Sequence, residues 1–224
     1  MTAGTTAGST PTGIGHAHAV TPPTVAAEEA VLLVVDVQND YASPEGALGR
    51  RGLDCAPALA AVEQMARLLP AARAAGVPVL HVHTQHSSWT DTPGWRRRGR
   101  GGSTIAPDTD PIVAAGSWGA EPYGDLVRSG DFTFVKHRYS AFAHTALDLV
   151  LRSLDRPTLV LVGLTSDVCV RATGVDAVSA GHRPVLVGDA TATAGVVPQS
   201  TACAEFAATV GPVVGTDELL EAWS

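Results

Sequence analysis

The chain has 224 residues, of which 45% are hydrophobic and 17% charged, and its formal net charge at pH 7 is −7. This size and apolar content predict one substantial globular domain rather than two. The acidic balance excludes broad electrostatic attraction to nucleic acid or to an anionic membrane, and no apolar run approaches the roughly 18 residues of a membrane span.

Three cysteines, Cys55, Cys169 and Cys203, form no CxxC motif. Thiol chemistry in a reducing compartment is therefore favoured over disulfide bonds, and we predict a cytoplasmic protein. Residues 1–27 are rich in Thr, Ala, Gly, Pro and Ser, and they lack the basic and apolar regions of a signal peptide. We predict a flexible arm over 1–27 and a single domain over 28–224.

Short apolar runs rich in β-branched residues alternate with helical patterns along the rest of the chain. In chain order, strands are predicted at 31–35, 77–84, 132–135, 157–162, 184–188 and 212–214. Helices are predicted at 59–75, 145–154, 170–180 and 199–209, and after Thr216. Pro70 is expected to kink or divide the first of these helices. The alternation predicts an α/β fold whose mainly parallel sheet of about six strands is covered by helices on both faces.

The long segment 85–120 has no clear periodicity. Loops of this length in a compact domain are usually functional or disordered, and its Trp residues favour a lid or a subunit contact over disorder. Arg96, Arg97, Arg98 and Arg100 within it form either a solvated loop or a clamp for an anionic substrate. No GxGxxG follows the first strand and no GxxxxGK[ST] occurs, so dinucleotide and P-loop sites lose their main support.

Three residues with useful chemistry occupy equivalent places at strand ends. Asp36 follows the first strand, Lys136 follows the third, and Cys169 lies where the fourth strand gives way to a helix. The carboxyl ends of parallel strands share one edge, so these side chains are expected to meet. A carboxylate can take the thiol proton, an ammonium can stabilise both anions, and a thiolate can attack a carbonyl. The helix N-terminus is expected to lower the pKa of the thiol.

Other arrangements stay open at this point. A Cys–His pair is second, since His81, His83 and His86 lie at or just beyond the end of the second strand. A Ser-His-Asp site lacks its G-x-S-x-G elbow. The chain is alternatively a catalytically idle binding protein, although an intact Asp-Lys-Cys set argues against that.

Three blocks of the sequence carry a family resemblance. They are 33–41 (LVVDVQNDY), 135–142 (VKHRYSAF) and 163–170 (GLTSDVCV), and in this order they resemble the signature blocks of the isochorismatase-like cysteine hydrolases over about residues 28–214. The resemblance implies a doubly wound, three-layer α/β/α fold with Asp36, Lys136 and Cys169 as catalytic triad. It also implies a cis peptide before the cysteine, expected at Thr165–Ser166, and an oxyanion hole formed by the backbone N–H groups of Thr165, Ser166 and Cys169.

The resemblance points most closely to amidohydrolases of ureidoacrylate and N-carbamoylsarcosine, which implies a small ureido or amide substrate and a homodimer or homotetramer. Biuret, triuret, maleamate and nicotinamide remain alternative substrate types. Nicotinamidases carry an Asp-x-His metal motif where this chain has 85–88 (QHSS), so we predict no metal and no cofactor. The presence of Cys169 argues against true isochorismatase activity. The residues expected to contact substrate, with ordinary packing as the alternative, are Asn39, Tyr41, His86, Trp89 and Tyr139.

Overall fold

The computed structural model describes residues 25–96, 112–195 and 197–224. Its centre is a six-stranded sheet in the order β3-β2-β1-β4-β5-β6, in which every neighbouring pair is parallel. The strands are β1 (Ala30–Val35), β2 (Val79–Thr84), β3 (Phe132–Lys136), β4 (Thr158–Leu164), β5 (Arg183–Ala192) and β6 (Val213–Val214). The predicted strand positions and the parallel, doubly wound sheet are confirmed.

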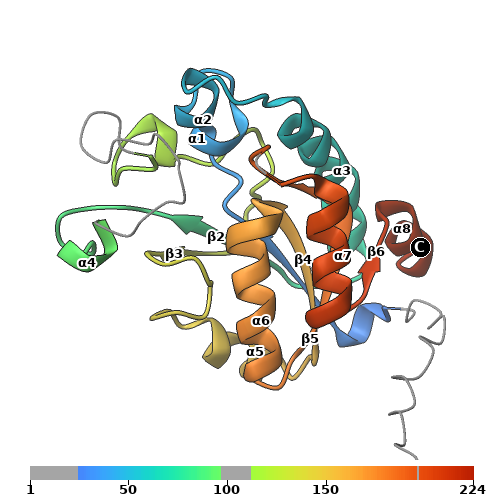
Figure 1. Cartoon of the computed structure of the whole chain (residues 1–224). Helices are drawn as coiled ribbons and strands as arrows, with labels where there is room; N and C mark the ends of the chain where they lie inside the picture. The colour runs from blue at the N-terminus through green and yellow to red at the C-terminus, as the bar shows by residue number, and fades with distance from the viewer. Residues whose placement is uncertain (1–24, 97–111, 196) are drawn as a thin grey trace, which may run out of the picture.

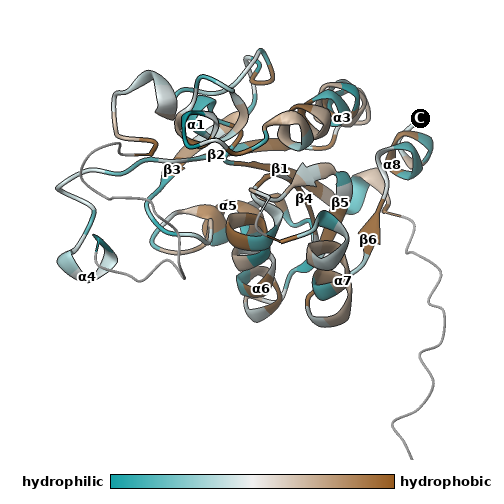
Figure 2. Cartoon of the chain, turned by 45° about the horizontal axis from the view of Figure 1, so that its top comes forward, coloured by the Kyte–Doolittle hydropathy of each residue, from teal (hydrophilic) through white to brown (hydrophobic). Residues whose placement is uncertain are grey.

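The sheet lies between two layers of helices (Figures 1 and 2). The helices are α1 (Asn39–Ala42), α2 (Ala47–Arg50), α3 (Ala56–Ala74), α4 (Pro93–Arg96), α5 (Leu147–Leu154), α6 (Arg171–Ser179), α7 (Gln199–Thr209) and α8 (Thr216–Ala222). Three shorter turns are η1 (Ala27–Glu29), η2 (Trp118–Ala120) and the π-helical η3 (Ser166–Val170). Figure 2 shows α1, α3 and α8 on one face of the sheet and α5, α6 and α7 on the other.

Successive side chains of the central strands point to opposite faces of the sheet, so one hydrophobic core forms on each face. Leu32 and Val34 of β1 pack into the core beneath α3, whereas Leu33 and Val35 pack into the core beneath α5, α6 and α7. All six residues of β1 are buried because this strand is covered on both sides. This complete burial explains why its sequence is a continuous apolar run.

Two predicted details of the elements differ in the structure. Helix α3 continues through Pro70, so the predicted division is wrong; its buried side chains, which include Met65 and Leu69, hold one face on the sheet throughout. Strand β5 is longer than predicted because Thr191 and Ala192 pair again with the end of β4 after a register irregularity.

The predicted arm lies mostly outside the described residues, since the structure describes the chain from Val25 onward. Val25 is only 5% exposed, and its carbonyl accepts a hydrogen bond of 3.0 Å from Trp223 Nε1. The packed domain therefore begins at least three residues earlier than the predicted boundary. In the part of the chain described here, no helix has the length and apolar character needed to cross a bilayer.

Candidate active site

The carboxyl ends of β1 and β4 form the place where strand order reverses in this sheet, because β1 pairs with β2 on one side and β4 on the other. Open α/β sheets bind ligands at such a switch point. Asp36 directly follows β1, and Cys169 lies in η3, just beyond β4. Lys136 is the last residue of β3, two strands from β1, and its long side chain spans that separation.

Asp36 and Lys136 form a buried ion pair. Asp36 Oδ2 lies 2.7 Å from Lys136 Nζ, and both side chains have no exposed surface. The ammonium also donates to Thr84 Oγ1 at 2.6 Å and to the Arg138 carbonyl at 2.9 Å. Burial by itself lowers the pKa of Lys136, but the negative charge of Asp36, with a further effect from Cys169, outweighs it and raises the pKa. The lysine is therefore a fixed cation at the base of the site.

The Cys169 thiol meets this ion pair inside the protein. Burial raises the pKa of Cys169, and the charge of Asp36 raises it further, whereas Lys136 acts in the opposite direction. Asp36 and Lys136 both lie close enough to affect the pKa of the thiol, so the three predicted side chains do come together. The predicted lowering of the thiol pKa is wrong, because removal of the sulfur from water outweighs the helix terminus.

The turn that carries Cys169 is held by backbone and side-chain contacts. The Thr165 carbonyl accepts hydrogen bonds from Val168 N at 3.1 Å and Val170 N at 3.2 Å, the second closing the wider π-helical turn. The Cys169 carbonyl accepts from Thr173 Oγ1 at 2.7 Å. Ser166 Oγ donates to Gln199 Oε1 at 2.7 Å, so its hydroxyl hydrogen is engaged within the protein. The assignment of the Thr165, Ser166 and Cys169 N–H groups to an oxyanion hole stays a prediction.

The cis peptide bond precedes the cysteine, but it joins Leu164 to Thr165 and not Thr165 to Ser166. The predicted position is wrong by one residue because the turn begins at Leu164, the last residue of β4. One residue earlier still, Gly163 has a φ of 117°, and a Cβ there would lie 2.1 Å from the Val35 carbonyl oxygen. This glycine lets β4 approach the end of β1 directly beside Asp36.

Sequence reasoning missed two buried residues beside the triad. Thr84, at the end of β2, donates from Oγ1 to Asp36 Oδ1 at 2.9 Å while accepting from Lys136. Gln38 holds Thr84 by its backbone: Gln38 Oε1 accepts from Thr84 N at 2.8 Å, and Nε2 donates to the Thr84 carbonyl at 2.9 Å. The strand-end criterion that selected Asp36 and Lys136 also applies to Thr84.

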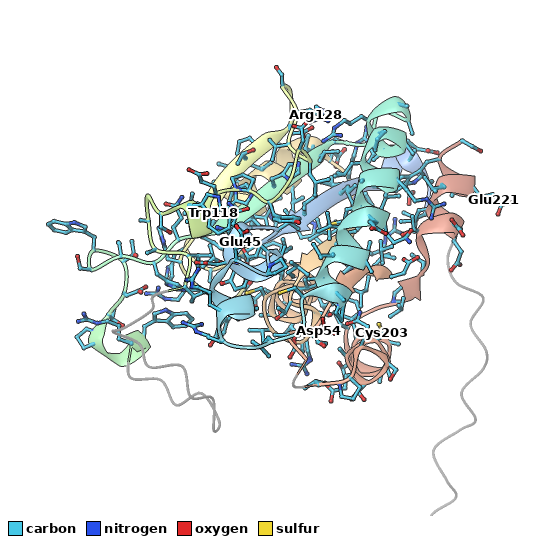
Figure 3. The ribbon with its side chains drawn as sticks, turned by 90° about the horizontal axis from the view of Figure 1, so that it is seen from above. Glu45, Asp54, Trp118, Arg128, Cys203 and Glu221 are labelled. Carbon is cyan, nitrogen blue, oxygen red and sulfur yellow. The ribbon has the colours of Figure 1, made fainter. Side chains whose placement is uncertain are left out.

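The predicted substrate contacts separate into different environments. The Asn39 amide donates to the Trp118 carbonyl at 2.8 Å, which fastens η2 beside α1 (Figure 3 labels Trp118 of η2 and Glu45, one of the residues between α1 and α2). Tyr41 is partly buried against the core beneath α3. Trp89 is 95% exposed, which contradicts a place in the pocket wall of a single chain; it lies in the turn after β2, which leaves its ring in solvent.

His86 and Tyr139 join an aromatic cluster beyond the ends of β2 and β3. Trp95 of α4 lies between them, with ring centroids 6.2 Å from His86 and 5.0 Å from Tyr139. The Arg138 guanidinium lies 4.8 Å from the Trp95 ring centroid, and His86 Nδ1 is 3.0 Å from Asp91 Oδ1. The cluster is close to the triad in sequence, because Arg138 and Tyr139 come two and three residues after Lys136. Arg97, Arg98 and Arg100 of the predicted anion clamp lie outside the described residues.

Comparison with known proteins agrees with this geometry. The family model of the isochorismatase domain matches residues 30–218. The chain belongs to the isochorismatase family.

Individual family members point to amide chemistry. The chain is 35% identical over 174 residues to ureidoacrylate amidohydrolase RutB of Methylobacterium radiotolerans, an alignment that covers 73% of this chain and 67% of the relative. A cysteine hydrolase from Pseudomonas syringae pv. phaseolicola superposes with a TM-score of 0.78 at 25% identity, covering 93% of this chain and 98% of the other. N-carbamoylsarcosine amidase from Thermoplasma acidophilum gives a TM-score of 0.67 at 30% identity, with 84% and 97% covered.

His81 and His83, two candidates for a Cys–His pair, are buried on β2. His81 Nε2 lies 3.1 Å from Asp131 Oδ2, and burial lowers the pKa of His81 to about 4. Burial also lowers the pKa of His83, against an opposing effect of Asp36. The charged side chains that act on the Cys169 thiol are Asp36 and Lys136, which favours the Asp-Lys-Cys arrangement over a Cys–His pair. Within residues 25–96, 112–195 and 197–224, no three His, Cys, Asp or Glu side chains are grouped as metal ligands.

Proposed function

We propose that the protein is a cysteine-dependent amidohydrolase that cleaves a linear ureido, carbamoyl or amide C–N bond and releases ammonia. At the coarser level, family membership and similarity to amidohydrolases support a hydrolase of non-peptide C–N bonds. The observation that carries the cysteine mechanism is the buried Asp36–Lys136 ion pair acting on the Cys169 thiol at the switch point.

The substrate class follows from what the relatives share. Ureidoacrylate and N-carbamoylsarcosine, named for two of them, both carry a carbamoyl group on nitrogen and a carboxylic acid in the same small molecule. We propose that this chain acts on a ureido or N-carbamoyl acid of the same kind.

The first half of the reaction begins from a protonated thiol, because burial raises the pKa of Cys169. Asp36 accepts the thiol proton as the sulfur attacks the carbonyl carbon, so the carboxylate serves as general base. Lys136 keeps a positive charge beside both groups during this transfer. The developing oxyanion is held by the backbone N–H groups of Thr165, Ser166 and Cys169.

The second half returns the enzyme to its starting state. Asp36 gives the proton to the departing nitrogen, the C–N bond breaks, and a thioester or thiocarbamate remains on Cys169. Water then attacks this carbonyl, its proton is taken by Asp36, and the C–S bond breaks to regenerate the thiol. A single carboxylate therefore acts as base and acid in turn, while Lys136 is never required to titrate.

The proposal is tested by ammonia release from ureidoacrylate, N-carbamoyl amino acids, biuret, maleamate and nicotinamide. We expect turnover of at least one ureido or N-carbamoyl acid, abolished in Cys169→Ala and reduced to a trace in Cys169→Ser. Cys55→Ala is the matched control, because Cys55 lies before α3 and donates to the Leu53 carbonyl at 3.7 Å. Full turnover in Cys169→Ala would contradict the nucleophile. Absence of turnover of every compound by the unmodified protein would favour an idle binding role.

A further inference from the structure

The polar contacts beneath the Cys169 thiol form a closed ring of three groups. Lys136 Nζ lies 2.7 Å from Asp36 Oδ2 and 2.6 Å from Thr84 Oγ1, and Thr84 Oγ1 lies 2.9 Å from Asp36 Oδ1. Each member comes from a different strand end, and all three are at most 3% exposed. We propose that Thr84 is a positioning residue whose hydroxyl fixes the carboxylate of Asp36 and the ammonium of Lys136 relative to the Cys169 sulfur.

The direction of each hydrogen bond in the ring is determined by its charges. An ammonium can only donate, so the Thr84 oxygen accepts from Lys136 and its hydrogen must point elsewhere. A carboxylate can only accept, so that hydrogen is directed to Asp36 Oδ1. The hydroxyl therefore uses both of its capacities on charged partners, where hydrogen bonds are stronger than between neutral groups.

The ring divides the two carboxylate oxygens of Asp36 between different tasks. Oδ1 is occupied by the hydroxyl, so rotation of the carboxylate would break a charge-assisted hydrogen bond. Oδ2 makes the ion-pair contact with Lys136 and has no hydrogen bond of good geometry among the described residues. Oδ2 thus keeps lone-pair capacity for the thiol proton. This assignment rests on the proposed function, in which Asp36 is the base.

The backbone of Thr84 is held by the side chain of Gln38. Beyond its pairing in the sheet, its N–H donates to Gln38 Oε1 at 2.8 Å and its carbonyl accepts from Gln38 Nε2 at 2.9 Å. The same Nε2 donates to the Ala120 carbonyl at 2.7 Å, which connects β2 to η2. A hydroxyl on a backbone clamped at both polar groups has little freedom, which suits a positioning role.

Three titratable groups face Asp36 from the packed elements: Lys136 from β3, Cys169 from η3 and His83 from β2. Burial lowers the pKa of His83, so this side chain is neutral at pH 7. The charge balance around Asp36 near neutral pH therefore depends on Lys136 and on the proton of Cys169. If loss of the Thr84 hydroxyl changes the pH dependence of activity or of Cys169 alkylation, the change reports on Lys136 and on the proton of Cys169.

The test compares Thr84→Val, which replaces the hydroxyl by a methyl group, with Thr84→Ser, which restores a hydroxyl. For Thr84→Val we expect kcat to fall roughly 10- to 100-fold, because hydrogen bonds to charged groups are lost. KM should change less than about twofold. The acidic limb of kcat/KM should move to higher pH, since the charged carboxylate loses a donor that favours it. Thr84→Ser should recover most of the lost kcat and return the acidic limb close to its original pH.

A second readout does not need a substrate. The rate at which iodoacetamide modifies Cys169 is measured against pH by peptide mass spectrometry, and in Thr84→Val the profile should shift to higher pH because the cation is no longer fixed beside the sulfur. Thr158→Val is the matched control: Thr158 is a buried threonine at the opposite end of β4, where its Oγ1 accepts from Arg183 at 3.1 Å.

The outcomes separate the two proposals. A profile of Thr84→Val that superposes on that of the unmodified protein, with only a lower melting temperature, would overturn the positioning role. If the unmodified protein releases no ammonia from any compound but its alkylation profile depends on the Thr84 hydroxyl, the amidohydrolase proposal fails and the positioning role stands. A change of equal size in Thr158→Val would also overturn it.

Discussion

Replacement of Lys136 by methionine removes the cation from a site that keeps its anion. At 2.7 Å and an effective dielectric constant of about 20, the attraction between Lys136 and Asp36 amounts to about 6 kcal/mol. The desolvation cost that the lysine no longer incurs offsets part of this, and loss of one partner from a buried pair typically costs 3–5 kcal/mol, as a rough range. We therefore expect Lys136→Met to lower the free energy of unfolding at pH 7 by about 3–5 kcal/mol.

The assay is urea unfolding of a double-mutant cycle that combines Lys136→Met with Asp36→Asn. Because the second change removes the uncompensated charge, the double variant should be more stable than Lys136→Met alone. The pKa of Lys136 is raised in the folded state, so its contribution is complete below the ordinary value of 10.5 and is lost as the pH rises through the folded value. On the alkaline side, the stability difference between the unmodified protein and Lys136→Met should therefore begin to shrink only in strongly alkaline solution. A loss below about 1 kcal/mol, typical of an exposed ion pair, would refute the reasoning.

Three further predictions concern the thiol, the turn and the edge of the sheet. Because burial raises the pKa of Cys169, alkylation by iodoacetamide without substrate should be slow at pH 7 and still rising at pH 9, and a plateau near neutral pH would show a preformed thiolate. Gly163→Ala should cost at least about 2 kcal/mol in urea unfolding and more than Gly52→Ala, since both glycines have positive φ but only Gly163 faces backbone within 4 Å. We propose a homodimer or homotetramer through the exposed edge strand β3, where Phe132 is 43% exposed. Light scattering should give at least twice 22.9 kDa, and Phe132→Glu, but not the control Val178→Glu on α6, should lower that mass.

The strands were predictable because fully buried parallel strands have a pronounced composition. The run 31–35 is apolar at every position, and the structure buries every residue of it. Parallel strands also place their carboxyl ends along one edge, so the meeting of Asp36, Lys136 and Cys169 followed from strand order without any knowledge of the loops. Asp36 and Lys136 are placed by the sheet, which is the most predictable part of the fold, whereas the exact position of Cys169 also depends on the η3 turn.

What was not predictable depends on distances that sequence does not contain. Burial of the Cys169 sulfur decides whether its pKa is raised or lowered, and the extent of burial depends on how the whole molecule packs. Thr84 lies at a strand end as Asp36 and Lys136 do, but its side chain is uncharged and common, so the strand-end position alone did not single it out. Trp89 was expected in a pocket because of its residue type, yet side-chain direction in an irregular segment is set by packing, and here the ring is 95% exposed.

A protonated thiol is compatible with nucleophilic attack if the charges of the site are followed through the reaction. Before attack the buried site contains one cation, Lys136, and one anion, Asp36, beside a neutral sulfur. Transfer of the thiol proton to Asp36 neutralises the carboxylate as negative charge develops on the substrate oxygen, so the number of buried charges never changes. A preformed thiolate would instead place two anions against one cation in a buried site, an arrangement that burial makes costly. The raised thiol pKa therefore favours proton transfer coupled to attack, with Lys136 neutralising whichever partner is the anion at each stage.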